Sequence, residues 1–154
     1  MEIYDLITPA SVIANLRVAT KRQALQELAR RAAALTHLDE HKIFETLLER
    51  EQLGTTGIGA GTAVPHGRLA DLSRPVALFA RLEKPLDFDA IDSQPGDLIF
   101  LLLTPSDASA DHLKALARIS RLLRNRAMCT KLRGTDGTDA IYALLTDRAA
   151  SHAA

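Results

Sequence analysis

Residues 97–103, DLIFLLL, place six consecutive apolar side chains after an aspartate, and Thr104 and Pro105 follow directly. A run this short falls far below the roughly 20 residues that a membrane-spanning helix needs. Apolar residues at every position, bounded by turn residues, are typical of a strand that is buried on both faces. The stretch therefore predicts a buried strand within a sheet.

A second apolar strand is predicted just before this one. Residues 76–82, VALFARL, are apolar on both of the faces that a strand presents, so this segment is also expected in the interior of the sheet. The segment that joins the two strands, residues 83–96, is rich in turn-forming residues. A short edge strand is predicted around residues 12–16.

Helical periodicity fills most of the remaining chain. The predicted helices cover residues 21–36, 40–52, 111–125, 127–133 and 139–147. Thr20 and Gln23 fit a capping box for the first of them, and Asp39 is a suitable cap for the second. Thr138 is expected to cap the last helix.

Helices before, between and after a few strands, without an internal repeat, indicate an α/β protein. The alternation is irregular, because two helices precede the glycine-rich stretch 54–69 and a strand pair follows it. We therefore expect a three-layer α/β/α sandwich around a small mixed β-sheet. A single domain over residues 1–154 is expected from the length, with a frayed tail over residues 148–154.

The composition argues against several classes of protein. Lys and Arg number 19, as do Asp and Glu, so the formal net charge of zero gives no basic footprint for nucleic acid. The one cysteine, Cys129, rules out an internal disulfide and is expected in the core rather than as a reactive thiol. Without a signal-peptide pattern or a long apolar segment, the expected location is cytoplasmic and not membrane-embedded.

The glycine-rich stretch leads to the first candidate for chemistry. Residues 54–69, GTTGIGAGTAVPHGRL, hold too many glycines for a helix, so the backbone must turn tightly or approach a neighbour closely. Pro65 restricts the residue before it, and Gly67 is expected to let the chain turn directly after His66. A neutral imidazole on such a support suits a metal ligand, a general base or a phosphoryl acceptor.

Known nucleotide-binding and zinc-binding patterns do not fit this stretch. A dinucleotide-binding motif needs GxGxxG between a strand and a helix, whereas Gly57, Gly59 and Gly61 follow a predicted helix. A P-loop needs Lys and Ser or Thr directly after its last glycine, but Ala60 follows Gly59. The ligand pairs of zinc sites, such as HExxH or CxxC, are also absent from the sequence.

Two further residues are candidates, and each also has an ordinary structural explanation. His112 is expected in the first turn of its helix, where backbone donors favour anions, but a solvated histidine on a polar helix face fits the same pattern. Arg50 is expected in the last turn of its helix, where a cation complements the helix dipole without any further role. His66 itself fits a turn histidine without a chemical function. The remaining histidines, His37, His41 and His152, are expected to be solvated or in the tail.

Residues 50–69, REQLGTTGIGAGTAVPHGRL, resemble the active-site signature of enzyme IIA of the mannitol/fructose class in the bacterial phosphotransferase system, in particular its nitrogen-regulatory branch. The similarity continues through LDFDAIDSQPGDLIFLLLTP and DHLKALARISRLLRN, so it covers nearly the whole chain. The family signature usually has serine where Thr55 stands and asparagine where Ala60 stands. The hydroxyl is kept at Thr55, but a side-chain hydrogen bond is lost at Ala60.

The resemblance implies an α/β/α fold and phosphorylation of His66 at Nε2. The donor would be a small histidine phosphocarrier protein, which an enzyme I charges from phosphoenolpyruvate. Arg50 matches the family's supporting arginine, which stabilises phosphoryl charge, and His112 matches the second histidine, a supporting donor. Glycine backbone donors are expected to complete the anion site. Neither a metal nor a bound cofactor is implied.

The expected role is that of a phosphoryl-transfer component that regulates partner proteins, such as a sensor kinase or a potassium transporter, rather than a conventional turnover enzyme. A sugar-specific enzyme IIA that passes phosphate to a transporter is the nearest alternative. A regulatory module that binds an anion without covalent transfer is an alternative of another class. A hydrolase with His66 as general base ranks last, because no nucleophile or metal is evident. The sequence leaves the oligomeric state open.

Overall fold

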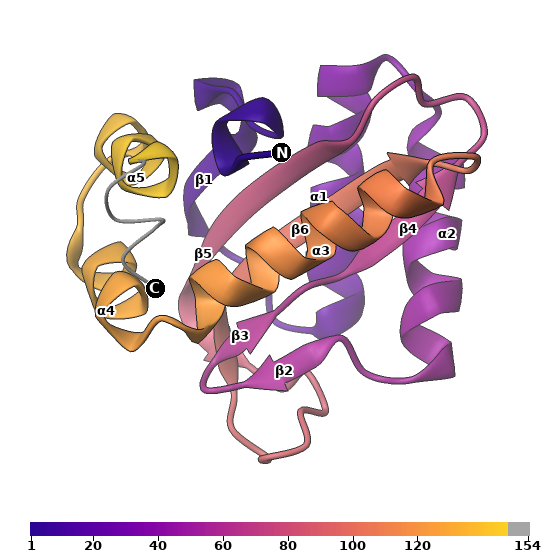
Figure 1. Cartoon of the computed structure of the whole chain (residues 1–154). Helices are drawn as coiled ribbons and strands as arrows, with labels where there is room; N and C mark the ends of the chain where they lie inside the picture. Colours follow the sequence, from indigo (N-terminus) through magenta and orange to yellow (C-terminus); the bar gives the residue numbers. More distant parts are fainter. Residues whose placement is uncertain (148–154) are drawn as a thin grey trace.

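The computed structural model describes residues 1–147, so the predicted frayed tail lies outside the described residues. Figure 1 shows the chain with its elements labelled. In chain order these are η1 (Ile3–Asp5), η2 (Pro9–Ser11), β1 (Val12–Leu16), α1 (Lys21–Thr36), α2 (Glu40–Leu53), β2 (Gly57–Gly59), β3 (Thr62–Ala63), β4 (His66–Leu69), β5 (Val76–Leu86), β6 (Gly96–Pro105), α3 (Ser109–Arg124), α4 (Arg126–Gly134) and α5 (Thr138–Thr146).

The sheet is mixed, as predicted, and β6 is at its centre. Its strand order is β1-β5-β6-β3-β2, and β4 also pairs with β6. On one edge β6 pairs antiparallel with β5, and on the other it pairs parallel with β3 and then β4. The strand predicted from residues 97–103 is therefore hydrogen-bonded on both edges.

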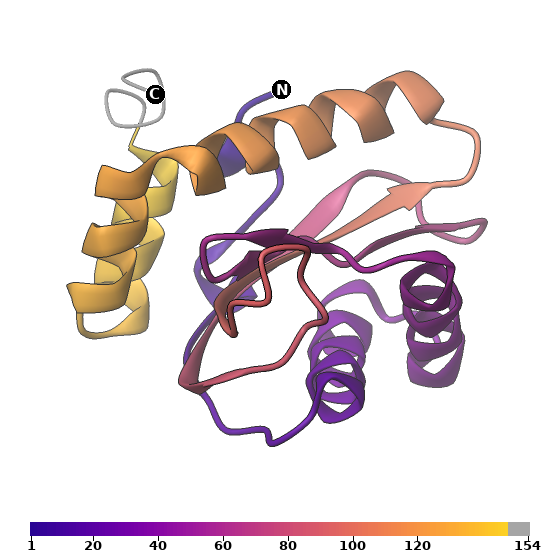
Figure 2. The same ribbon diagram turned by 90° about the horizontal axis from the view of Figure 1, so that it is seen from below.

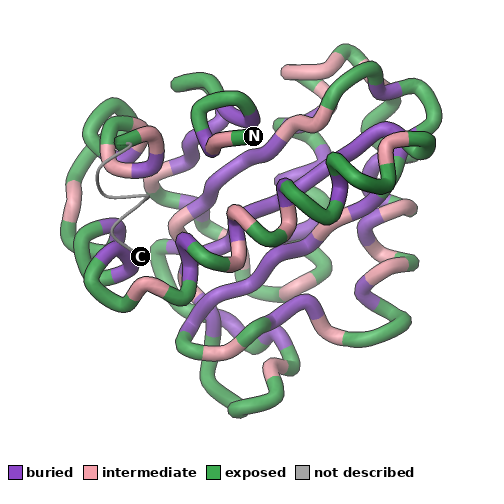
Figure 3. Tube along the Cα trace, viewed as in Figure 1, coloured by how far each residue is buried: buried purple, intermediate pink, exposed green. Residues whose placement is uncertain are grey.

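Helices cover both faces of this sheet and form three layers. In Figure 2, α1 and α2 lie on one side of the sheet and α3 lies on the other, with α4 and α5 at one end. Within β6, residues 99, 101 and 103 belong to the core beneath α1 and α2, whereas residues 98, 100 and 102 belong to the core beneath α3. Figure 3 shows β6 as buried over nearly its whole length. The prediction of an α/β/α sandwich is confirmed.

The helix caps follow the sequence signals with one exception. The Thr20 side chain accepts from the backbone N–H of Gln23, and the Asp39 side chain caps α2 in the same way. The predicted cap at Thr138 is wrong, because this residue is already the first of α5. Gly137 is the N-cap, and its positive φ of 89° turns the chain into the helix.

The predicted turn directly after His66 is also wrong. The chain continues as β4, parallel to β6, with His66 opposite Leu102. Gly67 serves a close approach instead, since a Cβ there would lie only 2.6 Å from Cγ2 of Thr46 in α2. Proline and glycine on either side of a histidine are local turn signals, but pairing with the buried strand β6 decides the conformation here.

The guanidinium group of Arg81 ties the end of α4 to the sheet. Arg81, on β5, donates through Nε to the Ala14 carbonyl at 3.0 Å. Its Nη1 donates to the carbonyls of Leu132, at 2.8 Å, and Thr135, at 2.6 Å, at the end of α4. These are carbonyls that the helix cannot satisfy internally, so Arg81 acts as a cap supplied from the sheet.

We expect Arg81→Met to lower the free energy of unfolding by about 2–3 kcal/mol, because charge-assisted donors to several carbonyls are lost together. Urea denaturation followed by circular dichroism measures this loss. Arg17→Met is the matched control, since its ion pair with Glu83 joins side chains that are 80% and 44% exposed. Such a surface pair contributes about 0–1 kcal/mol, so equal losses in the two variants would contradict the assigned role.

Candidate functional site

His66 is the first residue of β4, and its ring is fixed by the backbone just before it. Its Nδ1 lies 2.8 Å from the carbonyl oxygen of Val64. A carbonyl only accepts, so in the neutral imidazole Nδ1 carries the proton and Nε2 carries the lone pair. The half-buried ring is therefore held with its unprotonated nitrogen Nε2 directed away from Val64.

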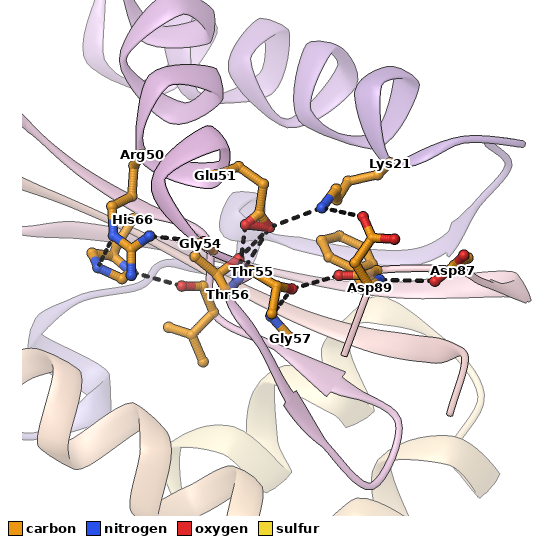
Figure 4. Close-up of polar contacts among 12 residues, drawn as sticks. Lys21, Arg50, Glu51, Gly54, Thr55, Thr56, Gly57, His66, Asp87 and Asp89 are labelled. Atoms are coloured by element: carbon orange, nitrogen blue, oxygen red, sulfur yellow. Dashed lines mark hydrogen bonds and ion pairs between the residues drawn. The ribbon is translucent and has the colours of Figure 1, made fainter. Parts of the chain in front are cut away.

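Arg50 reaches this nitrogen from the last turn of α2, as Figure 4 shows. Its Nε lies 3.3 Å from Nε2 of His66, and its Nη1 donates to the Gly54 carbonyl at 2.9 Å. The contact with Gly54 orients the guanidinium plane toward the histidine. Arg50 therefore does more than complement the helix dipole, because it also donates to Nε2 of His66.

His112 approaches from α3, on the other side of the ring. Its centroid lies 5.5 Å from that of His66, with the ring planes at 57°. The alternative of a solvated histidine is wrong, since His112 is only 6% exposed and its Nδ1 lies 2.6 Å from Oγ1 of Thr104. Because α3 begins at Ser109, earlier than predicted, the backbone N–H of His112 already bonds to Ala108. His112 can serve the site only through its imidazole.

The fold therefore brings the three predicted residues together, and it adds a second arginine. Arg68 follows His66 by two positions in a strand, so both side chains point to the face that α3 covers. Its Nη1 donates to the Ser109 hydroxyl, at the start of α3, at 3.1 Å. Sequence reasoning missed Arg68 because the segment was predicted to turn, and strand alternation would have revealed it.

A buried carboxylate next to Arg50 holds the segment between α2 and β2. Glu51 is 7% exposed and accepts from both the backbone N–H and the hydroxyl of Thr56, at 2.7 and 2.8 Å. Lys21 lies 3.7 Å from this carboxylate and pairs with Asp89 (Figure 4). No sequence pattern indicates this role of Glu51, which holds the chain immediately after Arg50.

The glycines of the stretch do not form the expected anion site at His66. Gly59 and Gly61 adopt positive φ in the β2–β3 hairpin, and a Cβ at Gly61 would lie 2.6 Å from the guanidinium of Arg133. Between them, Ala60 donates to Asp92 at 2.9 Å and accepts from Arg133 at 3.0 Å. Backbone contacts thus hold this turn in place of the asparagine side chain that the family signature usually has.

Burial and neighbouring cations keep both site histidines neutral. Burial lowers the pKa of His66 most, and the charges of Arg50 and Arg68 lower it further, while the bond to Val64 opposes the change. The pKa of His112 is lowered by burial, then by Arg68 and by His66. In the unfolded chain each histidine titrates near its ordinary pKa of about 6.5, and in the folded protein its pKa is lower. As pH falls from about 6.5 through the folded pKa values, the unfolded chain therefore binds more protons than the folded protein, and the free energy of unfolding decreases.

The remaining sequence predictions concern residues away from this site. Cys129 is buried, as predicted, and His37 and His41 are exposed, whereas His152 lies outside the described residues. Across residues 1–147 no group of three or more His, Cys, Asp or Glu side chains is arranged to hold a metal ion. The same residues contain no helix long and apolar enough to span a membrane.

The fold is a mixed sheet between two helical layers, and the site holds one histidine between an arginine and a second histidine. Together they define an enzyme IIA-type protein. The chain belongs to the family described as phosphoenolpyruvate-dependent sugar phosphotransferase system, EIIA 2, whose model matches residues 5–148. This confirms the resemblance drawn from the sequence.

Curated relatives are named for nitrogen regulation. The chain is 54% identical to a nitrogen regulatory protein of Bradyrhizobium diazoefficiens over 94% of this chain and 95% of that protein. It is 41% identical to a nitrogen regulatory protein of Escherichia coli K12, over 96% and 91% of the two chains. The crystal structure of nitrogen regulatory protein IIA-Ntr from Neisseria meningitidis matches with a TM-score of 0.89 at 30% identity, covering 94% of this chain and 99% of that one.

We expect Arg68→Gln to raise the pKa of both His66 and His112, because a positive charge that disfavours their protonated forms is removed. Titration of the imidazole protons by NMR measures both values in one experiment. Arg17→Gln, which removes an arginine that pairs with Glu83 instead, is the control. A pKa change confined to His112 would show that Arg68 does not act on His66.

Proposed function

We propose that this protein is a phosphohistidine carrier and regulator of a nitrogen-type phosphotransferase system. His66 accepts a phosphoryl group at Nε2 from a small histidine phosphocarrier protein in the cytoplasm, where phosphoenolpyruvate is available. The observation that carries this proposal is the 2.8 Å bond between Nδ1 of His66 and the Val64 carbonyl. It leaves Nε2 as the ring nitrogen that carries the lone pair, held only by a long contact with Arg50, for attack on phosphorus.

The transfer step follows from this arrangement of atoms. The Nε2 lone pair forms the new bond to phosphorus as the bond between phosphorus and the donor imidazole breaks, and that imidazole keeps the electron pair. The Nδ1 proton stays on His66, where the Val64 carbonyl stabilises the positive charge that the ring acquires. Charge in the loose transition state lies on the equatorial oxygens, so catalysis depends on positioned donors.

Those donors are already in place around Nε2. Arg50 makes a long contact of 3.3 Å with Nε2, which it exchanges for phosphoryl oxygens when the group arrives. The ring centroid of His112 lies 5.5 Å from that of His66, and Arg68 contributes positive charge from the same strand face. Arg50, Arg68 and His112 all stabilise a dianionic phosphoryl group on His66.

Exposed apolar residues beside the site suit docking of the donor protein. Leu53, at the end of α2 next to Gly54, is 86% exposed, and Leu113, next to His112, is 66% exposed. Large apolar side chains on the surface are typical of protein interfaces when they flank a functional group. This pair supplies the apolar rim that a donor protein needs.

Regulation follows from the change of charge at the same surface. Phosphorylation adds close to two negative charges where Arg50 and Arg68 otherwise present positive charge. A partner that binds the unmodified, positively charged surface is repelled by the phosphorylated one. A partner that binds the phosphorylated surface is repelled by the unmodified one. The resemblance suggests a sensor kinase or a potassium transporter as such a partner.

We expect radiolabelled phosphoenolpyruvate, enzyme I and the small phosphocarrier protein to yield an acid-labile adduct that is absent in His66→Ala. His41→Ala is the matched control, since this exposed histidine on α2 pairs with Glu45 and should label like the wild type. Labelling is quantified after electrophoresis at neutral pH. An adduct of undiminished intensity in His66→Ala would overturn the assignment of the acceptor.

Two other functions are separated by related experiments. The family description names a sugar phosphotransferase system, so a sugar-specific enzyme IIA is the second candidate. Rapid passage of phosphate from the labelled protein to the cytoplasmic domain of a fructose or mannitol permease would favour it. The proposed regulatory function, which agrees with the names of the relatives, predicts no rapid passage. A module that only binds anions would be stabilised by inorganic phosphate without ever forming the adduct.

A further inference from the structure

Thr104 is a fully buried hydroxyl residue at the C-terminal part of β6, in contact with His112. It lies opposite Arg68 in the pairing of β4 with β6. Alternation along β6 places its side chain on the same face as Leu98, Phe100 and Leu102. Figure 2 shows that α3 covers one face of the sheet, and these residues belong to the core beneath it. Thr104 is 0% exposed, and its Oγ1 lies 2.6 Å from Nδ1 of His112.

The direction of this hydrogen bond is decided by what Thr104 can do with its own proton. Its hydroxyl has one hydrogen and two lone pairs, and among the described residues Oγ1 makes no other hydrogen bond. If Thr104 only accepted from His112, its hydrogen would be buried without an acceptor, which costs about 1–3 kcal/mol. If Thr104 donates, only lone pairs stay unused. The hydroxyl therefore donates to Nδ1.

A histidine that accepts at Nδ1 carries its proton at Nε2. We propose that Thr104 is a positioning residue that holds His112 as the Nε2–H tautomer, so that His112 donates a hydrogen bond to the phosphoryl group on His66. This inference rests on the proposed function of His66. Nε2 of His112 makes no hydrogen bond within residues 1–147, so it is available for a group on the ring 5.5 Å away.

The tautomer matters because His112 is neutral. A protonated histidine would donate from both nitrogens whatever Thr104 did, but burial and the adjacent Arg68 disfavour that form. A neutral imidazole in the other tautomer would present a lone pair to the phosphoryl oxygens and repel them. One buried hydroxyl thus decides whether the second histidine attracts or repels the transferred group.

Two substitutions test the proposal on the intact protein. Thr104→Val keeps the shape of the side chain and removes the hydroxyl, and Thr104→Ser keeps the hydroxyl. Long-range ¹H–¹⁵N NMR of the imidazole nitrogens should show His112 protonated at Nε2 in the wild type and in Thr104→Ser. In Thr104→Val the population should shift toward the Nδ1–H form. An unchanged His112 tautomer in Thr104→Val would overturn the proposal.

The second measurement is the rate of phosphoryl transfer to His66. Thr104→Val should slow the transfer about threefold to tenfold, the net value of one hydrogen bond, and Thr104→Ser should stay close to the wild type. Thr62→Val is the matched control, because this buried hydroxyl bonds to the Gly59 carbonyl instead of an imidazole. Equal slowing in Thr62→Val and Thr104→Val would show a general packing effect and would overturn the proposed role.

The two arms separate this inference from the function on which it rests. If the wild type forms no adduct, the proposed function fails, but the NMR experiment still tests whether Thr104 sets the tautomer of His112. If the adduct forms and the tautomer does not respond to Thr104→Val, only the positioning role fails. Thermal unfolding of each variant verifies that it is folded. If Thr104→Val is not folded, Thr104→Ala, which also removes the hydroxyl, supplies the test with the same expected shift toward the Nδ1–H form.

Discussion

The structure depends on the pairing of β6, a strand whose two faces and two edges are all occupied. A strand without exposed faces must satisfy every backbone donor and acceptor within the protein, since water cannot reach them. β5 provides this on one edge, but no single strand provides it on the other. There β3 and β4 follow one another along β6, with Val64 and Pro65 between them.

The carbonyls of Val64 and Pro65 point to opposite edges at this place, and one of them orients the site histidine. The Pro65 carbonyl continues the pairing by accepting from Leu102, at 2.9 Å. The carbonyl of Val64 is directed instead to Nδ1 of His66, which determines where the imidazole proton resides. Successive carbonyls along a strand point to opposite edges, so the Val64 carbonyl faces away from β6, on the edge where the Val64 N–H bonds to the Thr56 carbonyl at 2.9 Å. The Thr56 N–H bonds to Glu51 instead of to Val64, and this leaves the Val64 carbonyl for His66.

The elements of the fold were accessible from sequence to different degrees. Buried strands and capped helices follow from local patterns, and the capping signals at Thr20 and Asp39 correspond to observed hydrogen bonds. The strand at His66 was missed, because its proline and glycine are local turn signals and only the unpaired edge of β6 accounts for the pairing. Missing this strand also concealed Arg68, whose relation to His66 depends on strand alternation.

The site residues divide in the same way. His66 and Arg50 lie close together in the sequence, and the resemblance to the family signature predicts both as site residues. Their contact, however, depends on how α2 ends. Thr104 and Glu51 left no signal, because each acts through one hydrogen-bonding neighbour that the tertiary fold supplies. Local patterns predict where chain segments begin and end, but they do not show which buried polar groups meet.

The contacts of Arg50 connect occupancy of the site to the segment that follows α2. Its guanidinium is shared between Nε2 of His66 and the Gly54 carbonyl, and the adjacent Glu51 holds Thr56. In the proposed function, a phosphoryl group on Nε2 would take the place of the first contact and draw the guanidinium toward its oxygens, in competition with the bond to Gly54. The buried Glu51 limits how far the chain can follow. Phosphorylation at this atom would therefore alter the charge and the orientation of one arginine on a surface that is otherwise held in place, and a binding partner could recognise that difference.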